Sequence, residues 1–286
     1  MATVTRATLR NDIRGDLMSW PIAATLDAAV DSQATTIQIA DDVYKNFLEQ
    51  KVLIEVDSEV MRVVDIEDAG FRVIRGYQGT TKAPHIKDAI VYIHSSYGWT
   101  DYELNNRIIP NAIQWLKPHA WIDQVSAAFT WTSQTIEATP PSGVSYPQGN
   151  FIYRLEVLDT DSNYKPIYGW HLYGSKIRFN RKASADHTLQ ARILQFQASL
   201  TDDTTVLDND NFRESIVKYG AHLCLNALKT NRVRYHEYAA ALNDRASTPD
   251  ELIRVAFDLK NQAIVSREEN AYPKPAGFAS TYREVL

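Results

Sequence analysis

The strongest local signal in this sequence is a helix start at Trp99-Thr100-Asp101-Tyr102-Glu103-Leu104. Thr100 is placed as the N-cap, and Glu103 follows three residues later, so each side chain can bond the backbone amide of the other residue. Trp99 precedes the cap and Leu104 is the fourth helical residue, a spacing at which two apolar side chains pack across the first turn. The segment therefore predicts a capping box, a hydrophobic staple and a fixed start for a central helix.

This central helix is expected to have one apolar face and one interruption. Its apolar residues recur at helical spacing: Leu104, Ile108, Ala112, Trp115 and Leu116. Pro110 has no amide hydrogen and crowds the carbonyl one turn before it, so we expect it to kink the helix.

Four other stretches have helical periodicity. They are residues 5–17, a stripe from Phe212 to Ala227, a stretch from Arg232 to Arg245, and a stretch that opens with Thr248-Pro249-Asp250-Glu251. The last is a second capping box with proline at the first helical position. Its expected apolar face consists of Leu252, Val255, Ala256, Leu259 and Ala263.

Between the helices, the pattern changes twice to short runs rich in β-branched and aromatic residues, which predict strands. The first set is 35–39, 52–56, 60–64, 71–75 and 89–93, with hairpin turns expected at Asp57-Ser58 and Asp68-Ala69-Gly70. The second set is 129–131, 151–158, 167–173, 176–179 and 189–196.

The predicted fold class is therefore α+β with a discontinuous organisation. A helical domain is assembled from residues 1–20, 96–126 and 200–270. Two small antiparallel β-domains, at 21–95 and 127–199, are inserted into its connections, and residues 271–286 form an extended C-terminal tail. Proline and glycine deny this tail a helix, while its aromatic residues suggest that it docks on a partner.

Composition excludes several classes of protein. A net charge of −5 over 286 residues gives no general basic surface for non-specific binding to nucleic acid. Cys224 is the only cysteine, so an intramolecular disulfide framework is excluded and a buried thiol is expected. No run approaches the roughly 18 apolar residues of a membrane span, and the N-terminal region lacks a signal-like apolar core. We expect a cytosolic product without a membrane partner.

Motifs for catalysis are missing as well. His236-Glu237 is not followed by a second histidine at metalloprotease spacing, and His222 and Cys224 are two residues apart on a helix, which points them to different faces. The sequence has no nucleophile elbow, dinucleotide fingerprint or Cys-x-x-Cys pair. We therefore expect no enzymatic activity, no catalytic residue and no cofactor.

Two stretches allow a ligand-binding interpretation. The segment from Arg75 to His85 has two glycines followed by hydroxyls and a lysine, but it lacks the strand-to-helix context of a phosphate-binding P-loop. A structural loop with glycines at positive φ and His85 bonded within the loop is favoured. The acidic residues 202–210 could bind calcium, but they lack the glycine and distal glutamate of an EF-hand, so helix capping is favoured and no metal site is expected.

Aromatic residues are the third candidate. Tyr153, Tyr168, Trp170 and Tyr173 could line a sugar site. On the strands of a small sheet, such residues more often pack in the core or across strands, which is the favoured interpretation.

Three separated stretches together resemble one family. They are Thr8–Arg14, the Trp99–Leu104 helix start followed by Asn105-Asn106-Arg107-Ile108-Ile109, and the segment from Tyr153 through Trp170-His171-Leu172 to Asp208-Asn209-Asp210-Asn211-Phe212 with the following helix. In this order they resemble head-to-tail adaptor (connector, or neck) proteins of tailed bacteriophages. The Arg75–His85 loop is similar to a β-module that recurs in phage virion proteins. The two β insertions depart from the simplest adaptors.

The resemblance implies a structural protein of the virion head–tail interface, assembled in the host cytoplasm. Such proteins form a ring, usually of twelve copies, that joins the portal to downstream neck or tail proteins and extends the channel for double-stranded DNA without reading its sequence. Arg232, Arg234, Asp244 and Arg245 are then candidates for the interface between subunits. By the same analogy, the tail would anchor on the portal through Tyr272, Pro273, Pro275, Phe278 and Tyr282.

Two other functions stay open. A phage tail or baseplate component would use its β-domains as the working parts and could bind a glycan or another partner at the Tyr168–Tyr173 aromatics; it would bind saccharide without affinity for the portal. A hydrolase would show turnover and would lose it when one carboxylate or histidine is changed.

Overall fold

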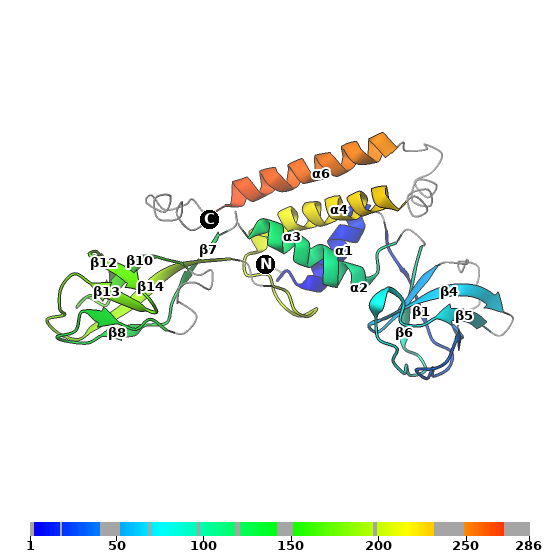
Figure 1. The fold of residues 1–286 in the computed structure, drawn as a ribbon, viewed down its shortest axis with the longest axis horizontal. Helices are drawn as coiled ribbons and strands as arrows, with labels where there is room; N and C mark the ends of the chain where they lie inside the picture. The colour runs from blue at the N-terminus through cyan, green and yellow to red at the C-terminus, as the bar shows by residue number, and fades with distance from the viewer. Residues whose placement is uncertain are drawn as a thin grey trace. The chain divides into compact units, whose positions relative to one another are not determined.

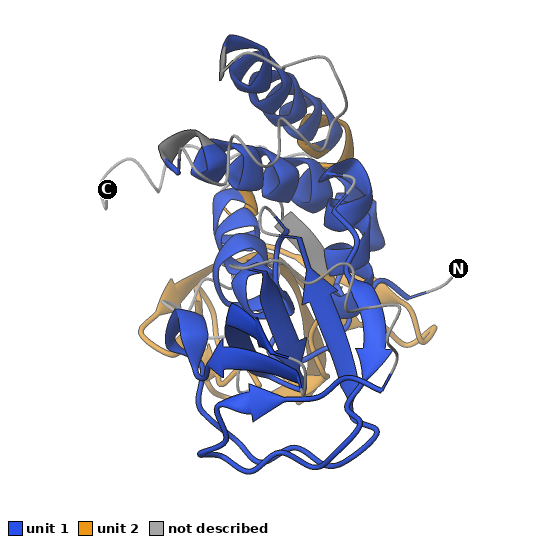
Figure 2. Cartoon of the chain, turned by 90° about the vertical axis from the view of Figure 1, so that its right-hand side faces the viewer, with its two compact units in different colours: residues 1–115, 199–266 blue, residues 116–198, 267–286 orange. Residues whose placement is uncertain are grey.

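The computed structural model describes residues 3–17, 19–40, 52–67, 70–95, 98–117, 121–141, 151–196, 199–231 and 249–271. The chain divides into two compact units (Figure 2). The first comprises residues 1–115 and 199–266, and the second comprises residues 116–198 and 267–286. Helices combine with antiparallel sheets, which confirms the α+β class (Figure 1). Within its described part, the chain has no helix with both the length and the apolar character needed to cross a membrane.

The first unit contains a helical layer made from distant parts of the sequence. It consists of α1 (Arg6–Leu17), α2 (Asp101–Glu103), η3 (Leu104–Ile108), α3 (Ile109–Leu116), α4 (Arg213–Thr230) and α6 (Pro249–Asn270), with the short turn η4 (Asp210–Phe212) before α4. The periodic apolar residues are buried: Leu9, Ile13, Leu17, Leu104, Ile108, Phe212 and Ile216. Burial of one apolar stripe per helix is what holds such segments together.

Gly220 lets three of these segments approach closely. A Cβ at this position of α4 would lie 2.7 Å from Cδ1 of Ile13 in α1 and 3.4 Å from Cγ2 of Ile108 in η3. Two ion pairs also join α4 to α1: Arg213 binds Asp12 at 2.7 Å, and Lys218 binds Asp16 at 3.0 Å. The N-terminal helix, the central helix and α4 therefore form one packed layer.

The central helix is irregular just before Pro110. Residues Leu104–Ile108 form a π-helical turn, in which the amide of Ile109 bonds the carbonyl of Leu104. Pro110 cannot donate an amide hydrogen bond, and a widened turn is one way in which a helix accommodates that loss. The irregularity that the structure shows next to Pro110 is therefore a π turn.

The remaining part of the first unit is a six-stranded antiparallel sheet. Its strands are β1 (Ile22–Thr25), β2 (Thr36–Ile37), β3 (Leu53–Val56), β4 (Glu59–Glu67), β5 (Gly70–Ile74) and β6 (Ile90–His94), in the order β1-β6-β3-β4-β5-β2. Beyond the edge strands, the amide of Ala40 donates to the carbonyl of Thr25 at 2.9 Å, and the amide of Asp27 donates to the carbonyl of Gln38 at 3.0 Å. The sheet therefore closes on itself as a small barrel, which leaves little open edge.

The second unit contains two antiparallel sheets. The larger has β7 (Trp121–Val125), β8 (Phe129–Trp131), β10 (Phe151–Leu158), β11 (Tyr164–Ile167) and β14 (His187–Phe196); the smaller has β9 (Glu137–Ala138), β12 (Trp170–Tyr173) and β13 (Lys176–Phe179). One core cluster contains residues of both sheets, and within it Trp131 stacks on Phe179 with ring centroids 3.7 Å apart.

Several boundaries differ from the sequence expectation. Residues 121–125, assigned above to the helical domain, form β7 and pair with β14, so they belong to the second β region. The expected strand 167–173 is two strands, because Gly169 adopts a left-handed φ of 77° between them. The strand β1 was not predicted. The helix expected at Arg232–Arg245, the cap residue Thr248 and the tail from Tyr272 onwards lie outside the described residues.

Candidate functional site

The capping box predicted at the central helix is present. The hydroxyl of Thr100 accepts a hydrogen bond from the amide of Glu103 at 3.1 Å, and the amide of Thr100 donates to the Glu103 carboxylate at 3.4 Å. Trp99 and Leu104 are both buried, as a hydrophobic staple requires. These four residues define the helix start that the sequence indicated.

A carboxylate from the barrel completes the same helix start. Glu55, buried on β3, accepts hydrogen bonds from the amides of Asp101 at 2.7 Å and Tyr102 at 3.0 Å. His94 on β6 approaches the same carboxylate at 3.1 Å. Negative charge at a helix N-terminus is favourable because it meets unpaired amides and the positive end of the dipole. Glu55 therefore joins the barrel to the helical layer.

Two arginines of α1 connect the helix start to the acidic turn near residue 203. Arg14 forms an ion pair with Asp101 and donates to the carbonyl of Trp99 at 2.9 Å. Arg10 binds Asp101 at 3.2 Å and Asp203 at 2.9 Å. Burial alone would lower the pKa of Arg10, but the hydrogen bond that Arg10 donates to Asp203 and the negative charges of Asp101, Asp203 and Glu55 raise it. The pKa of Asp203 is lowered, chiefly by Arg10. The network ties three separated segments together.

The barrel has its own buried ion-pair cluster behind the Arg75–His85 loop. The carboxylate of Glu59 on β4 accepts hydrogen bonds from Nε (2.7 Å) and Nη2 (2.6 Å) of Arg75. It also accepts from the amides of Gly76 (2.9 Å) and Ala83 (3.0 Å), and Nε2 of His85 lies 3.0 Å from it. Burial alone would raise the pKa of Glu59, but hydrogen bonds from Arg75, Ala83, His85 and Gly76 lower it to about 2. The loop is therefore wrapped around one carboxylate.

This cluster supports the structural interpretation of the loop over a phosphate cradle. Gly76 and Gly79 adopt positive φ angles of 65° and 85°, as expected. The prediction that His85 bonds within its own loop is wrong for the side chain, which binds Glu59 and Asp57 (2.8 Å to Asp57) on and beside β4. The guanidinium of Arg75 and the amides of Gly76 and Ala83, which a phosphate would need as donors, are bound to Glu59.

The acidic stretch 202–210 serves turns and ion pairs. Asp202 accepts hydrogen bonds from Thr204 and Thr205, which lower its pKa to about 2. Asp210 accepts from the amide of Val4 at 3.4 Å, and the Asn209 side chain caps the turn η4. Among the described residues, no group of three or more His, Cys, Asp or Glu side chains is placed to hold a metal ion.

The candidate aromatic site is only partly packed. Trp170 is partly buried and donates its indole N–H to the carbonyl of Ile167 at 3.1 Å. Tyr168 and Tyr173, in contrast, are 84% and 62% exposed, so neither packs in the core. Tyr173 does pack across strands, because the guanidinium of Arg178 on β13 lies over its ring, 5.4 Å from the centroid. Gly169 separates the two strands at this point, and the chain turn leaves Tyr168 outside both sheets.

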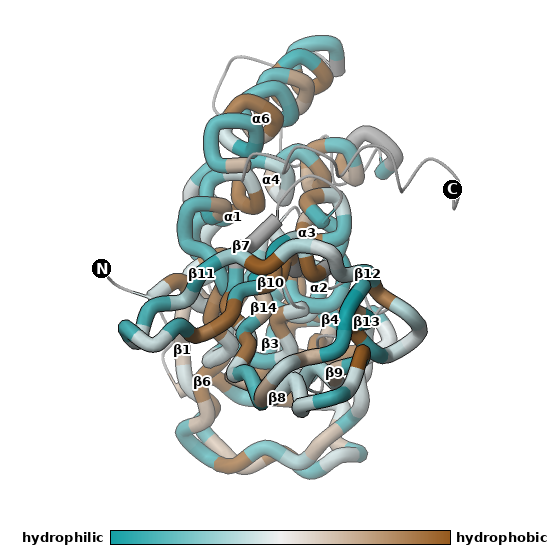
Figure 3. Tube along the Cα trace, turned by 90° about the vertical axis from the view of Figure 1, so that its left-hand side faces the viewer, coloured by the Kyte–Doolittle hydropathy of each residue, from teal (hydrophilic) through white to brown (hydrophobic). Residues whose placement is uncertain are grey.

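Helix α6 presents two kinds of apolar residue. Leu252, Ala256, Leu259 and Ala263 are buried, and α4 contacts this helix through Ser215–Ser266 (3.0 Å) and through His222, whose Nδ1 lies 2.6 Å from the carbonyl of Ala256. Val255, expected on the buried face, is 46% exposed, and Phe257 is 58% exposed. Ile253 and Val265 are exposed as well, and apolar segments alternate with polar ones along this helix (Figure 3).

The sites predicted from the resemblance are not among the described residues. This applies to the tail residues Tyr272, Pro273, Pro275, Phe278 and Tyr282, and to the subunit-interface candidates Arg232, Arg234, Asp244 and Arg245. Sequence inspection also missed Glu55 and Glu59. In the sequence, each is only an acidic residue within or beside an apolar strand. Such a residue usually faces solvent, so the pattern does not indicate burial.

The buried thiol predicted for Cys224 is confirmed, since Cys224 lies in the interior of α4. Comparison of the chain with models of known protein families gives no match, and no curated protein sequence matches it either.

Proposed function

We propose that this protein is a non-enzymatic structural component of a phage virion, a head-to-tail adaptor that forms a ring between the portal and the tail. The observation that carries the proposal is the interleaved architecture. Residues of α1, the central helix and α4 meet at Gly220, while the two β regions lie in the connections between them. The helical segments that meet there include those on which the resemblance to adaptor proteins rests, whereas the two β regions depart from the simplest adaptors.

The exposed apolar residues of α6 support self-association. Ile253 and Phe257 are four residues apart, so they lie on the same side of the helix beside the face that contacts α4. In a closed ring, each subunit offers its neighbour two different surfaces, and apolar residues on a long helix can supply one of them. We propose this part of α6 as a subunit contact, together with the interface candidates between Arg232 and Arg245.

The charge of the chain suits a conduit for DNA. Its net charge is −5, so a ring of many copies would not hold the phosphate backbone tightly along its length. The proposed role requires DNA to pass without sequence recognition.

The first experiment is to measure native mass and to image negatively stained particles of the protein alone and mixed with the portal protein of the same virus. We expect rings, alone or on the portal, and twelve copies per ring. A protein that stays monomeric and does not bind the portal protein would contradict the proposal. Truncation after Glu269 tests the docking tail: the shortened protein should keep its fold and lose portal binding.

A second candidate function is favoured by one observation, the exposure of Tyr168 and Tyr173. A tail or baseplate component could use these side chains to bind a glycan, because exposed aromatic rings stack on sugars. A glycan screen of the intact protein and of the Tyr168→Ala variant would test this. Saccharide binding that depends on Tyr168, without portal binding, would favour this function over the adaptor.

A further inference from the structure

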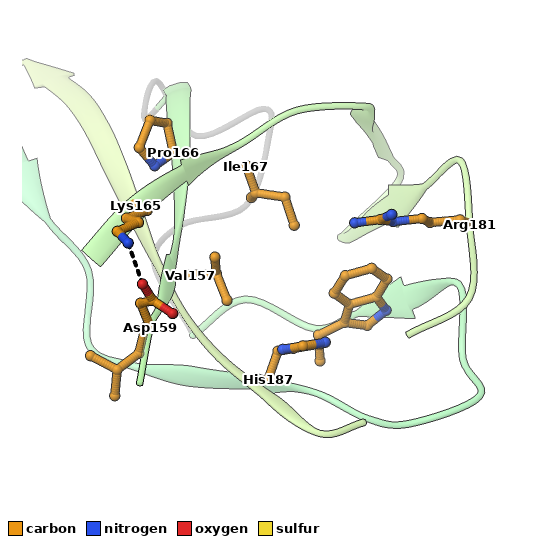
Figure 4. A pocket seen from close by; sticks show the side chains of 9 residues that line it. Val157, Asp159, Lys165, Pro166, Ile167, Arg181 and His187 are labelled. Carbon is orange, nitrogen blue, oxygen red and sulfur yellow. Dashed lines mark hydrogen bonds and ion pairs between the residues drawn. The ribbon is translucent and has the colours of Figure 1, made fainter. Parts of the chain in front are cut away.

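The second unit contains a cavity that neither proposed function uses. It has a volume of about 350 Å³, near the lower end of the range of small-molecule sites. Its lining comes from β8, β10, β11, the start of β14 and the segments that follow β10 and β13: Trp131, Val157, Leu158, Asp159, Lys165, Pro166, Ile167, Arg181 and His187 (Figure 4).

The sheet register explains why the cavity is largely apolar. Val157 pairs with Lys165 across β10 and β11, and Ile167 pairs with Leu155, which is fully buried. Paired residues share a face of the sheet, so Val157 and Ile167 continue the core face towards the cavity. Both are only partly buried and pack against the edge of the core cluster.

The floor is held rigidly. Trp131 is 2% exposed, stacks on Phe179, and donates its indole N–H to the carbonyl of Thr135 at 3.1 Å. His187 pairs with Trp131 across β14 and β8, with ring centroids 5.6 Å apart. Because so little of the indole is exposed, a sugar ring could not stack on it.

Two cationic side chains, those of Lys165 and Arg181, lie at the mouth of the cavity. Lys165 is already paired with Asp159, and this contact lowers the pKa of Asp159. Arg181 makes no ion pair or side-chain hydrogen bond to any residue that the structure describes. Figure 4 shows its guanidinium reaching into the cavity towards the side where Ile167 lies, with His187 at the other wall.

We propose that this cavity binds a small organic carboxylate with an aromatic or branched aliphatic body. The planar guanidinium of Arg181 matches a carboxylate with two parallel hydrogen bonds, and His187 offers a further ring N–H. The apolar body would lie against Val157 and Ile167. Inorganic phosphate fits less well, since its remaining oxygens would face these apolar side chains without donors.

The test is a calorimetric and NMR titration of the full-length protein with benzoate and 3-methylbutanoate, with benzyl alcohol as the uncharged analogue of benzoate. Two variants are compared, Arg181→Gln and Lys182→Gln. Both remove one positive charge from an exposed side chain, but Lys182 does not line the cavity. Thermal unfolding of both variants checks that the fold is unchanged.

We expect saturable binding of a carboxylate, weakened about tenfold by Arg181→Gln, as for loss of a charge-assisted hydrogen bond, and by less than about twofold by Lys182→Gln. The NMR shifts should include the indole N–H of Trp131. Absence of saturable binding, equal binding of benzyl alcohol, or equal losses in the two variants would overturn the proposal.

Discussion

The carboxylate of Glu55 holds the backbone amide of Asp101 at 2.7 Å across 46 residues of sequence. The same carboxylate binds the amide of Tyr102 and faces His94, so the start of the central helix depends on a residue of the barrel. This one side chain couples two parts of the first unit that the sequence suggested were separate domains.

Glu55→Ala should therefore destabilise the first unit strongly. The change leaves two helix amides and a buried histidine without their acceptor, and each buried group left unsatisfied costs about 1–3 kcal/mol. We expect a loss of about 3 kcal/mol in the free energy of unfolding, measured in urea. Glu67→Ala is the matched control, because Glu67 is an exposed residue of the same sheet and should change stability by less than about 0.5 kcal/mol. Equal effects would contradict the role of Glu55.

Gly220→Ala should destabilise the helical layer by overpacking. The added methyl group would lie 2.7 Å from Cδ1 and 3.2 Å from Cγ1 of Ile13, which is fully buried, so the Ile13 side chain must shift within the packed layer. A cost of about 1–3 kcal/mol is expected. Adding Ile13→Val removes the clashing carbon, so the double variant should regain part of this loss, as a double-mutant cycle would show.

Gly15→Ala is the control for helix propensity. Gly15 lies on the exposed side of α1, and its nearest obstacle is the Trp20 ring at 3.7 Å. Alanine there should stabilise by about 0.5–1 kcal/mol. Loss of stability in both glycine variants would mean that close packing at Gly220 is not the cause.

Part of this architecture is predictable from sequence because it is local. The capping box at Thr100 and the strands 129–131, 151–158 and 176–179 depend on neighbouring residues and on periodicity, and the structure confirms their bounds. Glu55 and Glu59 could not be recognised, because the partners that make their burial favourable come from other segments. Periodicity in one strand cannot show which distant donors a buried carboxylate will meet.

The same limit explains the errors on exposed residues. Val255 fits the apolar period of α6 but falls at the edge of the stripe, beyond the surface that α4 covers. Tyr168 lies in a run that looks like one strand, and only the left-handed Gly169 ends that strand early. Both residues fit the apolar pattern of their segment, but the position of the neighbouring helix or turn decides whether their side chains are exposed.

Acid should release the loop that encloses Glu59. The folded-state pKa of Glu59 is about 2, below the ordinary value of 4.5. A depressed carboxylate pKa adds stability above the unfolded-state pKa, and this stability disappears as the pH falls from about 4.5 to about 2. The stability that the lowered pKa contributes is on the order of 3 kcal/mol.

Glu59→Gln should be less stable than the wild type at pH 6 and should lose less stability on acidification, as urea titrations between pH 6 and pH 2.5 would show. Parallel curves would contradict this.

The contact between α4 and α6 should weaken below neutral pH. Nδ1 of His222 donates to the carbonyl of Ala256, and its Nε2 accepts from Asn226 at 2.9 Å, an arrangement that needs the neutral ring. Burial lowers the pKa of His222, and the charge of Lys260 lowers it further; together they outweigh the hydrogen bond to the Ala256 carbonyl, which raises it. A histidine pKa below its unfolded value of about 6.5 means that stability falls as the pH drops below that value.

Hydrogen exchange of the α6 amides at pH 7.5 and pH 5.5, corrected for intrinsic rates, measures this effect. We expect faster corrected exchange at pH 5.5 in the wild type. His222→Gln can keep one bond to Ala256 and does not titrate, so its corrected rates should be the same at the two pH values. A pH effect of equal size in the variant would assign it to another group.

Polar substitutions on α6 should separate assembly from folding. Ile253→Ser and Phe257→Ser together remove two exposed apolar side chains on one side of the helix, so the fold should keep its stability to within about 1 kcal/mol. If this side contacts a neighbouring subunit, the variant should form no rings, because truncation of buried interface anchors costs about 2 kcal/mol or more per contact.

Val255→Ser is the matched control. Val255 is also exposed, but it lies two residues before Phe257 and therefore points about 200° away around the helix axis. Native mass of the three proteins, with unfolding curves recorded in parallel, decides the point. Rings that persist in the double variant would exclude this surface, whereas loss of rings in the control alone would place the contact on the opposite side of α6.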